Sequence, residues 1–184
     1  MSILRFTVVV LLAGVVAGCS GHADRASESA TNDRVVDGDT LCGMVSQGDM
    51  EAAMGLKIKA VEARTYDKVA PLAACSYSAA FDLTSSELPE HINTRWNKLY
   101  NTDVAREFDR DFREEDGRAV DYRRVENLGE AAAFGHVPFL SHDVKLVVVG
   151  MVRGLRSVIE IQAPERMTTE QLAPLARKML DSHA

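Results

Sequence analysis

Three cysteines carry the most specific chemistry in this chain of 184 residues: Cys19, Cys42 and Cys75. A cysteine thiolate can be acylated, can bind a metal ion or can be oxidised to a disulfide. Cys19 ends an apolar run and directly follows small residues, whereas Cys42 and Cys75 lie far apart in a mixed sequence. The sequence around each cysteine therefore indicates which of these reactions it undergoes.

Residues 1–18 have the layout of a secretory signal: Arg5 supplies a positive charge, residues 6–16 are almost entirely apolar, and small residues precede Cys19. The apolar run is shorter than the roughly 20 residues that span a bilayer. The tetrapeptide Val-Ala-Gly-Cys resembles the bacterial lipobox. We expect Cys19 to become the first mature residue and to carry acyl chains such as palmitate, which anchor a protein stably when two or more are present. The alternative is a signal peptide whose cysteine is incidental.

Once Cys19 is assigned to lipid, Cys42 and Cys75 remain as a pair in an oxidising compartment. A zinc site is the alternative, but the chain has no Cys-x-x-Cys motif or suitably spaced histidine beside them. Their separation also argues against a redox-active pair. The sequence predicts a disulfide that stabilises the fold by roughly 3 to 4 kcal/mol.

The composition suits an exported globular protein. A hydrophobic content of 46% is enough to form a core. The formal net charge of -6 argues against nucleic acid as a partner, because phosphate binding requires clustered Lys and Arg. We expect a protein lipid-anchored to the cell membrane on its extracytoplasmic face, with no cofactor and no metal site.

The small, polar residues 19–34 predict a flexible tether, and residues 35–184 predict a single globular domain. Within it, Ser46 and Asp49 have capping-box spacing ahead of a helix from Gln47 to Met54. A second capped helix closes the chain after Thr168. Because Pro174 would remove a hydrogen bond, we expect this helix to start nearer Ala173.

Alternating apolar residues predict strands, with Ser141-His142-Asp143 and Arg153-Gly154 as turns. The predicted strands are 56–64, 75–83, 120–125, 133–140, 145–152 and 155–161. Their short connections favour antiparallel pairing. The expected fold class is α+β, with an antiparallel β-sheet of about five or six strands and amphipathic helices packed against it.

The segment from Glu90 to Phe112 has apolar residues at steps of three to five, which predicts one or two amphipathic helices. Part of this apolar stripe could overhang the sheet and line a pocket for an apolar molecule. The candidate pocket residues are Ile92, Trp96, Leu99, Phe108 and Phe112. The alternative is that the same residues are ordinary core.

The order of these features resembles a family. The lipobox, the polar tether, "LCGMVSQGDMEAAMG", "CSY", "VENLGEAAAF" and "LAPLARKML" together are similar to the actinobacterial secreted lipoproteins grouped as a domain of unknown function (DUF 3558). The resemblance covers roughly Asp39 to Leu180. It implies a small, lipid-anchored extracytoplasmic α+β domain without established activity, and it supplies no catalytic residues.

No catalytic signature emerges from the remaining polar residues. Ser141, His142 and Asp143 are consecutive, whereas the members of a catalytic triad converge from separate elements. Asp37-Gly38-Asp39 lacks the later ligands of a calcium loop, and the carboxylates of residues 107–116 are interleaved with arginines.

We therefore expect a noncatalytic binding or accessory module that serves an envelope lipid or a protein partner. The alternative is an envelope hydrolase whose active site is assembled from distant residues. A cleft in which His136 or His142 lies beside both a carboxylate and a free serine would favour this alternative.

Overall fold

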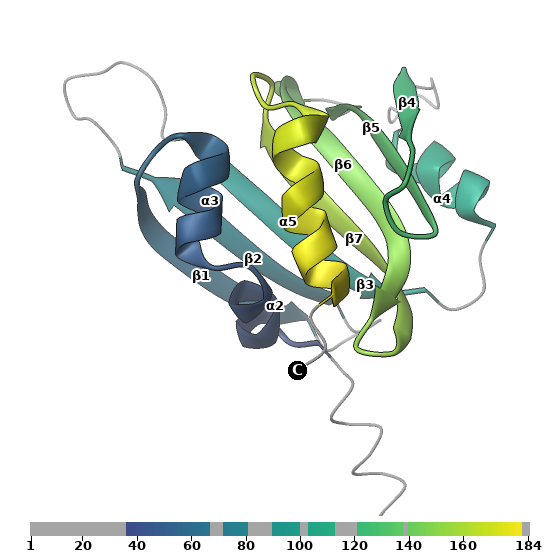
Figure 1. The fold of residues 1–184 in the computed structure, drawn as a ribbon, viewed down its shortest axis with the longest axis horizontal. Coiled ribbons are helices and arrows are strands. Elements are labelled where there is room, and N and C mark those ends of the chain that lie inside the picture. Colours follow the sequence, from purple (N-terminus) through teal and green to yellow (C-terminus); the bar gives the residue numbers. More distant parts are fainter. Residues whose placement is uncertain are drawn as a thin grey trace, which may run out of the picture. The chain divides into compact units, whose positions relative to one another are not determined.

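Seven strands form one antiparallel sheet in this computed structural model, which describes residues 36–66, 72–80, 90–99, 103–112, 121–137 and 140–181. The strands are β1 (Ile58–Tyr66), β2 (Leu72–Ala79), β3 (His91–Lys98), β4 (Tyr122–Val125), β5 (Ala131–Val137), β6 (Leu140–Val152) and β7 (Leu155–Pro164). Their order in the sheet is β1-β2-β3-β7-β6-β5-β4 (Figure 1). The fold class is α+β as predicted, with seven strands instead of five or six.

Four helices among the described residues pack against this sheet: α2 (Gly38–Met44), α3 (Gln47–Met54), α4 (Val104–Asp111) and α5 (Thr169–Asp181). Val148 of β6 belongs to the core cluster that holds the buried residues of α2, α3 and α5. Its neighbours Val147 and Val149 belong to the cluster of α4. Because successive strand residues point to opposite faces, α4 lies on the face opposite the other three helices.

Helix α3 has the predicted bounds, and its capping box is present. The Ser46 side chain accepts from the Asp49 amide, and the Asp49 carboxylate accepts from the Ser46 amide. Gly55 ends the helix with a φ of 71°, a left-handed conformation that glycine adopts without strain. Val45 and Met50, which flank the cap, are both fully buried. The local sequence signal for this helix is confirmed.

Helix α5 begins at Thr169, so the predicted start near Ala173 is wrong. Pro174 lies inside the helix and is exposed. Its missing amide would have bonded to the carbonyl of Glu170, which is also exposed and can bond to water instead. The buried residues on one side of α5 outweigh this local defect: Leu172, Ala173, Leu175, Ala176 and Met179.

The predicted helix from Glu90 to Phe112 is also wrong in its first half, because residues 91–98 form strand β3. Ile92, Thr94 and Trp96 are its inward, fully buried residues. Thr94 hides this alternation in the sequence because its side chain is polar, yet its hydroxyl lies 3.2 Å from the Cys75 carbonyl oxygen and is satisfied there. The helix is limited to α4, and β3 is the additional strand.

Two further local predictions had different outcomes. Arg153 and Gly154 form the predicted turn between β6 and β7, with φ values of 50° and 76° that are typical of a two-residue hairpin loop. Ser141-His142-Asp143 does not form a turn, because its backbone belongs to strand β6. Asp37, the first residue of the candidate calcium loop, caps helix α2 because its carboxylate accepts a hydrogen bond from the Thr40 amide.

Candidate functional site

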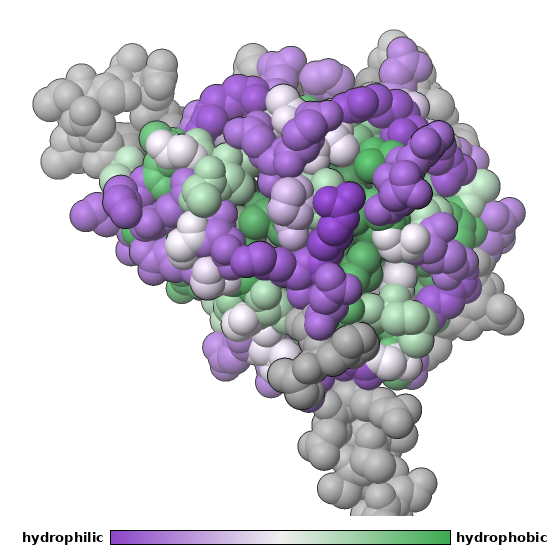
Figure 2. Space-filling view, in the orientation of Figure 1, coloured by the Kyte–Doolittle hydropathy of each residue, from purple (hydrophilic) through white to green (hydrophobic). Residues whose placement is uncertain are grey.

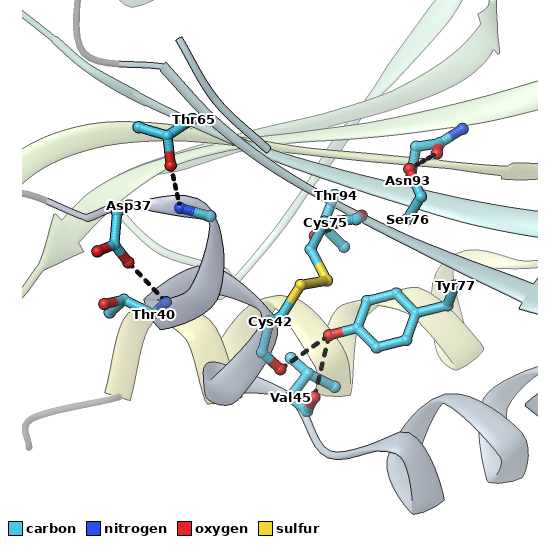
Figure 3. Close-up of a disulfide and its surroundings, with 11 residues drawn as sticks. Asp37, Thr40, Cys42, Val45, Thr65, Cys75, Ser76, Tyr77, Asn93 and Thr94 are labelled. Carbon is cyan, nitrogen blue, oxygen red and sulfur yellow. Dashed lines mark hydrogen bonds between the residues drawn. A yellow bond between two sulfur atoms is a disulfide. The ribbon is translucent and has the colours of Figure 1, made fainter. Parts of the chain in front are cut away.

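The predicted disulfide joins Cys42 of α2 to Cys75 of β2, with a Cα–Cα distance of 5.3 Å (Figure 3). Beside it, the Tyr77 hydroxyl lies 3.1 Å from the carbonyl oxygens of both Cys42 and Val45. Burial raises the pKa of Tyr77 to about 12, so its hydroxyl remains a proton donor. The disulfide, in which Cys75 is fully buried and Cys42 is partly buried, is thus part of a structural clamp that holds α2 against the sheet.

The five candidate pocket residues do not line one cavity. Ile92 and Trp96 belong to the core cluster beneath α2, α3 and α5. Leu99, Phe108 and Phe112 belong to the cluster beneath α4, on the other face of the sheet. Trp96, Phe108 and Phe112 have no exposed surface, and the Trp96 indole donates to the Ser157 hydroxyl at 2.9 Å. These residues pack as core in this structure.

The face of the sheet that carries α4 also presents a row of polar side chains that the sequence analysis missed. We call this row the polar sheet face: Ser76, Asn93, Arg95, Asp143, Lys145, Glu160 and Gln162. The strand register places them side by side, since Asn93 is opposite both Ser76 and Gln162, and Gln162 is also opposite Lys145. Strands β2, β3, β7 and β6 thus build one continuous polar surface.

Side-chain contacts tie this surface together. Ser76 donates to Asn93 at 2.6 Å, and Gln162 donates to Asp143 at 2.7 Å. Glu160 lies 3.6 Å from Lys145 and 4.0 Å from Arg95. Arg95 remains about half exposed. The polar sheet face can therefore offer both hydrogen-bonding groups and an accessible cation.

Asp111, at the end of α4, adjoins this surface. Its backbone carbonyl oxygen lies 3.4 Å from the Lys145 ammonium, and its carboxylate pairs with Arg110 at 3.3 Å. Burial and the nearby Glu160 carboxylate raise the pKa of Asp111 to about 6, despite the opposing effect of these two cations. Among the described residues, its buried Oδ2 atom has no hydrogen-bond partner. Asp111 is the most strongly perturbed carboxyl group at the site.

The alternation of polar residues in β3 could have revealed this surface. His91, Asn93, Arg95 and Asn97 occupy every second position of the strand. Once the segment is assigned to a strand, this period places all four on one face. A helix over the same segment would place these four side chains on different sides of its axis, so the helical prediction did not bring them together.

The candidate catalytic groups do not converge among the described residues. Ser76 bonds to Asn93, and Ser157 donates to the Leu155 carbonyl, so neither is paired with a histidine. His136 lies 4.0 Å from Glu165 on an exposed part of the molecule. The side chains of Ser141 and His142 lie outside the described residues.

The carboxylate-rich run and possible metal ligands were the remaining candidate sites. In the carboxylate-rich run 107–116, Glu107 is buried and pairs with Arg110, while residues 113–116 lie outside the described part. No group of three or more potential metal-ligating residues occurs in the part of the chain that the structure describes.

An open depression of about 450 Å³ lies between the β4–β5 turn, β6 and the end of α5.

The leader and Cys19 lie outside the described residues, so the anchor stays a prediction. Within the described ranges, no helix combines the length and apolarity that a membrane span requires. No family model, no curated protein and no solved structure matches the chain.

Proposed function

We propose that this protein is a noncatalytic binding module, held at the extracytoplasmic face of the cell membrane by lipid on Cys19, which binds a protein partner through the polar sheet face. The observation that carries the proposal is the continuous polar row across β2, β3, β7 and β6. None of the described helices other than α4 packs on this side of the sheet.

The contacts of the polar sheet face favour binding over hydrolysis. Hydrolysis by a serine nucleophile requires a base within hydrogen-bond distance. Ser76 instead faces the amide of Asn93, which cannot act as that base. Amide, hydroxyl and guanidinium groups spaced along strands are suited to bonding a complementary polar surface.

A protein partner is also favoured over a lipid. Lipid pockets are lined by apolar side chains that face a cavity, whereas Trp96 and Phe108 are fully packed. On the opposite face, over α2, α3 and α5, hydrophobic residues show only as small areas between hydrophilic ones (Figure 2). The half-exposed Arg95 would pair with an acidic group of the partner.

Site-directed photocrosslinking in the native envelope tests the proposal. A photoreactive amino acid at position 95 of the full, lipidated chain should give a discrete crosslinked species. The matched control is position 177, because Arg177 is likewise exposed but lies on α5, on the other face of the sheet. Crosslinks of equal yield from both positions, or no crosslink from position 95, would contradict the proposed surface.

A further inference from the structure

Strand β1 is an outer strand of the sheet, and helices contact it near both ends. Near its far end, the Gly38 amide of α2 donates to the Thr65 hydroxyl at 2.8 Å, and Gly38 lies against the Arg64 backbone. At its beginning, α3 makes the contacts. The Gln47 amide donates to the Ile58 carbonyl at 3.1 Å, and the Glu51 carboxylate accepts from the Ile58 amide at 3.1 Å. Helix α3 thereby satisfies the backbone of the first residue of β1. Such capping matters because unpaired strand edges pair readily with other strands.

The rest of β1 carries features of a pairing edge. Among the described residues, β1 has β2 as its single strand neighbour. Val61 and Tyr66 are 42% and 47% exposed, so each presents apolar surface to the solvent. Glu62 and Arg64 form an ion pair at 3.2 Å on one face of the strand, and both side chains are 62% exposed. Apolar and charged groups thus alternate along an accessible edge.

We infer that two copies of this chain pair antiparallel through β1, about a two-fold axis at Ala63. A two-fold axis makes the interface isologous, so each residue faces its counterpart reflected in sequence through the central position. With Ala63 at the centre, Glu62 of one copy faces Arg64 of the other, twice. Val61 then faces Thr65, and Ala60 faces Tyr66, which covers the exposed side chains of β1.

Charge selects this register over its neighbours. Paired residues must lie on the same face of the sheet, so the axis passes through a residue. An axis at Glu62 would oppose two carboxylates, and an axis at Arg64 would oppose two guanidinium groups, both of which destabilise a cross-strand pair. An axis at Val61 would place Glu62 opposite Ala60, so that its only ionic partner would be Arg64 of its own chain. Ala63 is the centre that pairs both charges across the interface.

Disulfide trapping tests the register. We would use the full chain carrying Cys19→Ser, so that neither lipid nor the Cys19 thiol contributes, and introduce Glu62→Cys or Arg64→Cys. Both positions lie on the face of β1 away from Cys75. Oxidation of an equimolar mixture of the two variants should give a covalent dimer, whereas each variant alone should stay largely monomeric. Met151→Cys, at an exposed site on β6, is the matched control and should not crosslink.

Charge reversal tests the same pairing without a covalent bond. By sedimentation at increasing concentration, the parent chain should approach twice the monomer mass. Glu62→Arg and Arg64→Glu should each remain monomeric, and the double exchange should dimerise again, which excludes misfolding as the cause. A parent chain that is monomeric at every concentration would overturn the inference. So would single variants that dimerise like the parent, or Glu62→Cys crosslinking alone as well as in the mixture.

Discussion

The hydroxyl of Tyr77 lies 3.1 Å from the carbonyl oxygen of Cys42, the residue whose side chain is bonded to Cys75. Cys75 and Tyr77 are two positions apart on β2, so both point from the sheet toward α2 (Figure 3). Helix α2 is therefore attached at one residue through both its side chain and its backbone. This double attachment makes the clamp sensitive to changes at either position.

Replacing Tyr77 by Phe should destabilise the protein by about 1 to 3 kcal/mol, because the Cys42 and Val45 carbonyls would lose a buried donor. Urea denaturation of the oxidised protein measures this change. Tyr66→Phe is the matched control, since Tyr66 is exposed, and should cost less than about 0.5 kcal/mol. Equal effects at both sites would contradict the clamp.

Replacing both Cys42 and Cys75 by Ala should lower the free energy of unfolding by roughly 3 to 4 kcal/mol, because the unfolded chain would regain the freedom of a loop closed over 33 residues. Denaturation of both proteins measures the loss. Intact mass after alkylation, with and without reductant, establishes the oxidation state. Two free thiols in protein recovered from the envelope would contradict the disulfide.

Asp111→Asn should change the pH dependence of stability. The pKa of Asp111 is raised in the folded state to about 6, from 3.8 for an ordinary Asp, so folding favours its protonated form. The contribution of this raised pKa to the free energy of unfolding is fully present below pH 4. As the pH rises through 6, this contribution of roughly 2 to 3 kcal/mol is lost. The Asn variant should lack this loss and should be the more stable protein at pH 7.

Denaturation at pH 4 and pH 7 measures this effect. The carboxyl group faces Arg110, Lys145 and Glu160, so the parent and variant must be compared at the same ionic strength. Glu126→Gln, at an exposed site in the β4–β5 turn, is the control and should keep the parent's pH profile. If Asp111→Asn shows an unchanged profile, the raised pKa is wrong.

Glycine substitutions should have opposite effects at different sites. Gly48→Ala should stabilise the protein by about 0.5 to 1 kcal/mol, because Gly48 is an exposed residue of α3 with no crowded neighbour. Gly129→Ala should destabilise it more than Gly154→Ala. Both have positive φ, which costs about 1 to 2 kcal/mol for alanine, but a Cβ at Gly129 would also meet the Val149 carbonyl oxygen at 2.5 Å. Thermal unfolding ranks the three variants, and equal losses at the latter two sites would argue against the clash.

Cys19→Ala should leave the chain exported but without its lipid, because acylation requires the thiol. Detergent-phase partitioning measures the anchor: the parent chain should enter the detergent phase, and the variant should remain in the aqueous phase. Parent protein that partitions as completely into the aqueous phase would contradict lipidation.

Several features of this protein were determined by short stretches of sequence. The cap of α3 joins Ser46 to Asp49. Gly55 ends the same helix because glycine adopts the left-handed conformation without strain. The Arg153-Gly154 turn likewise depends on two adjacent residues. The disulfide followed from cysteine count and expected compartment. These predictions succeeded because the decisive interactions are local, or because few pairings were possible.

Other features were decided by contacts between distant segments. Residues 91–98 form a strand because Thr94 bonds to Cys75 and Trp96 bonds to Ser157, contacts that span 19 and 61 residues. The same apolar residues also fit a helical period in the sequence. That period gave no indication that Thr94 and Trp96 bond to Cys75 and Ser157.

The polar sheet face also depends on contacts between segments that are distant in the sequence. Arg95 and Glu160 become neighbours only because β3 pairs with β7, and Lys145 joins them because β6 pairs with β7 on the other side. Asp111 approaches this group only when α4 packs on that face. Strand order is determined by contacts across the whole sheet and with its helices, which no short window of sequence contains. Capped helices and turns were therefore predictable from the sequence, whereas the candidate site required the tertiary structure.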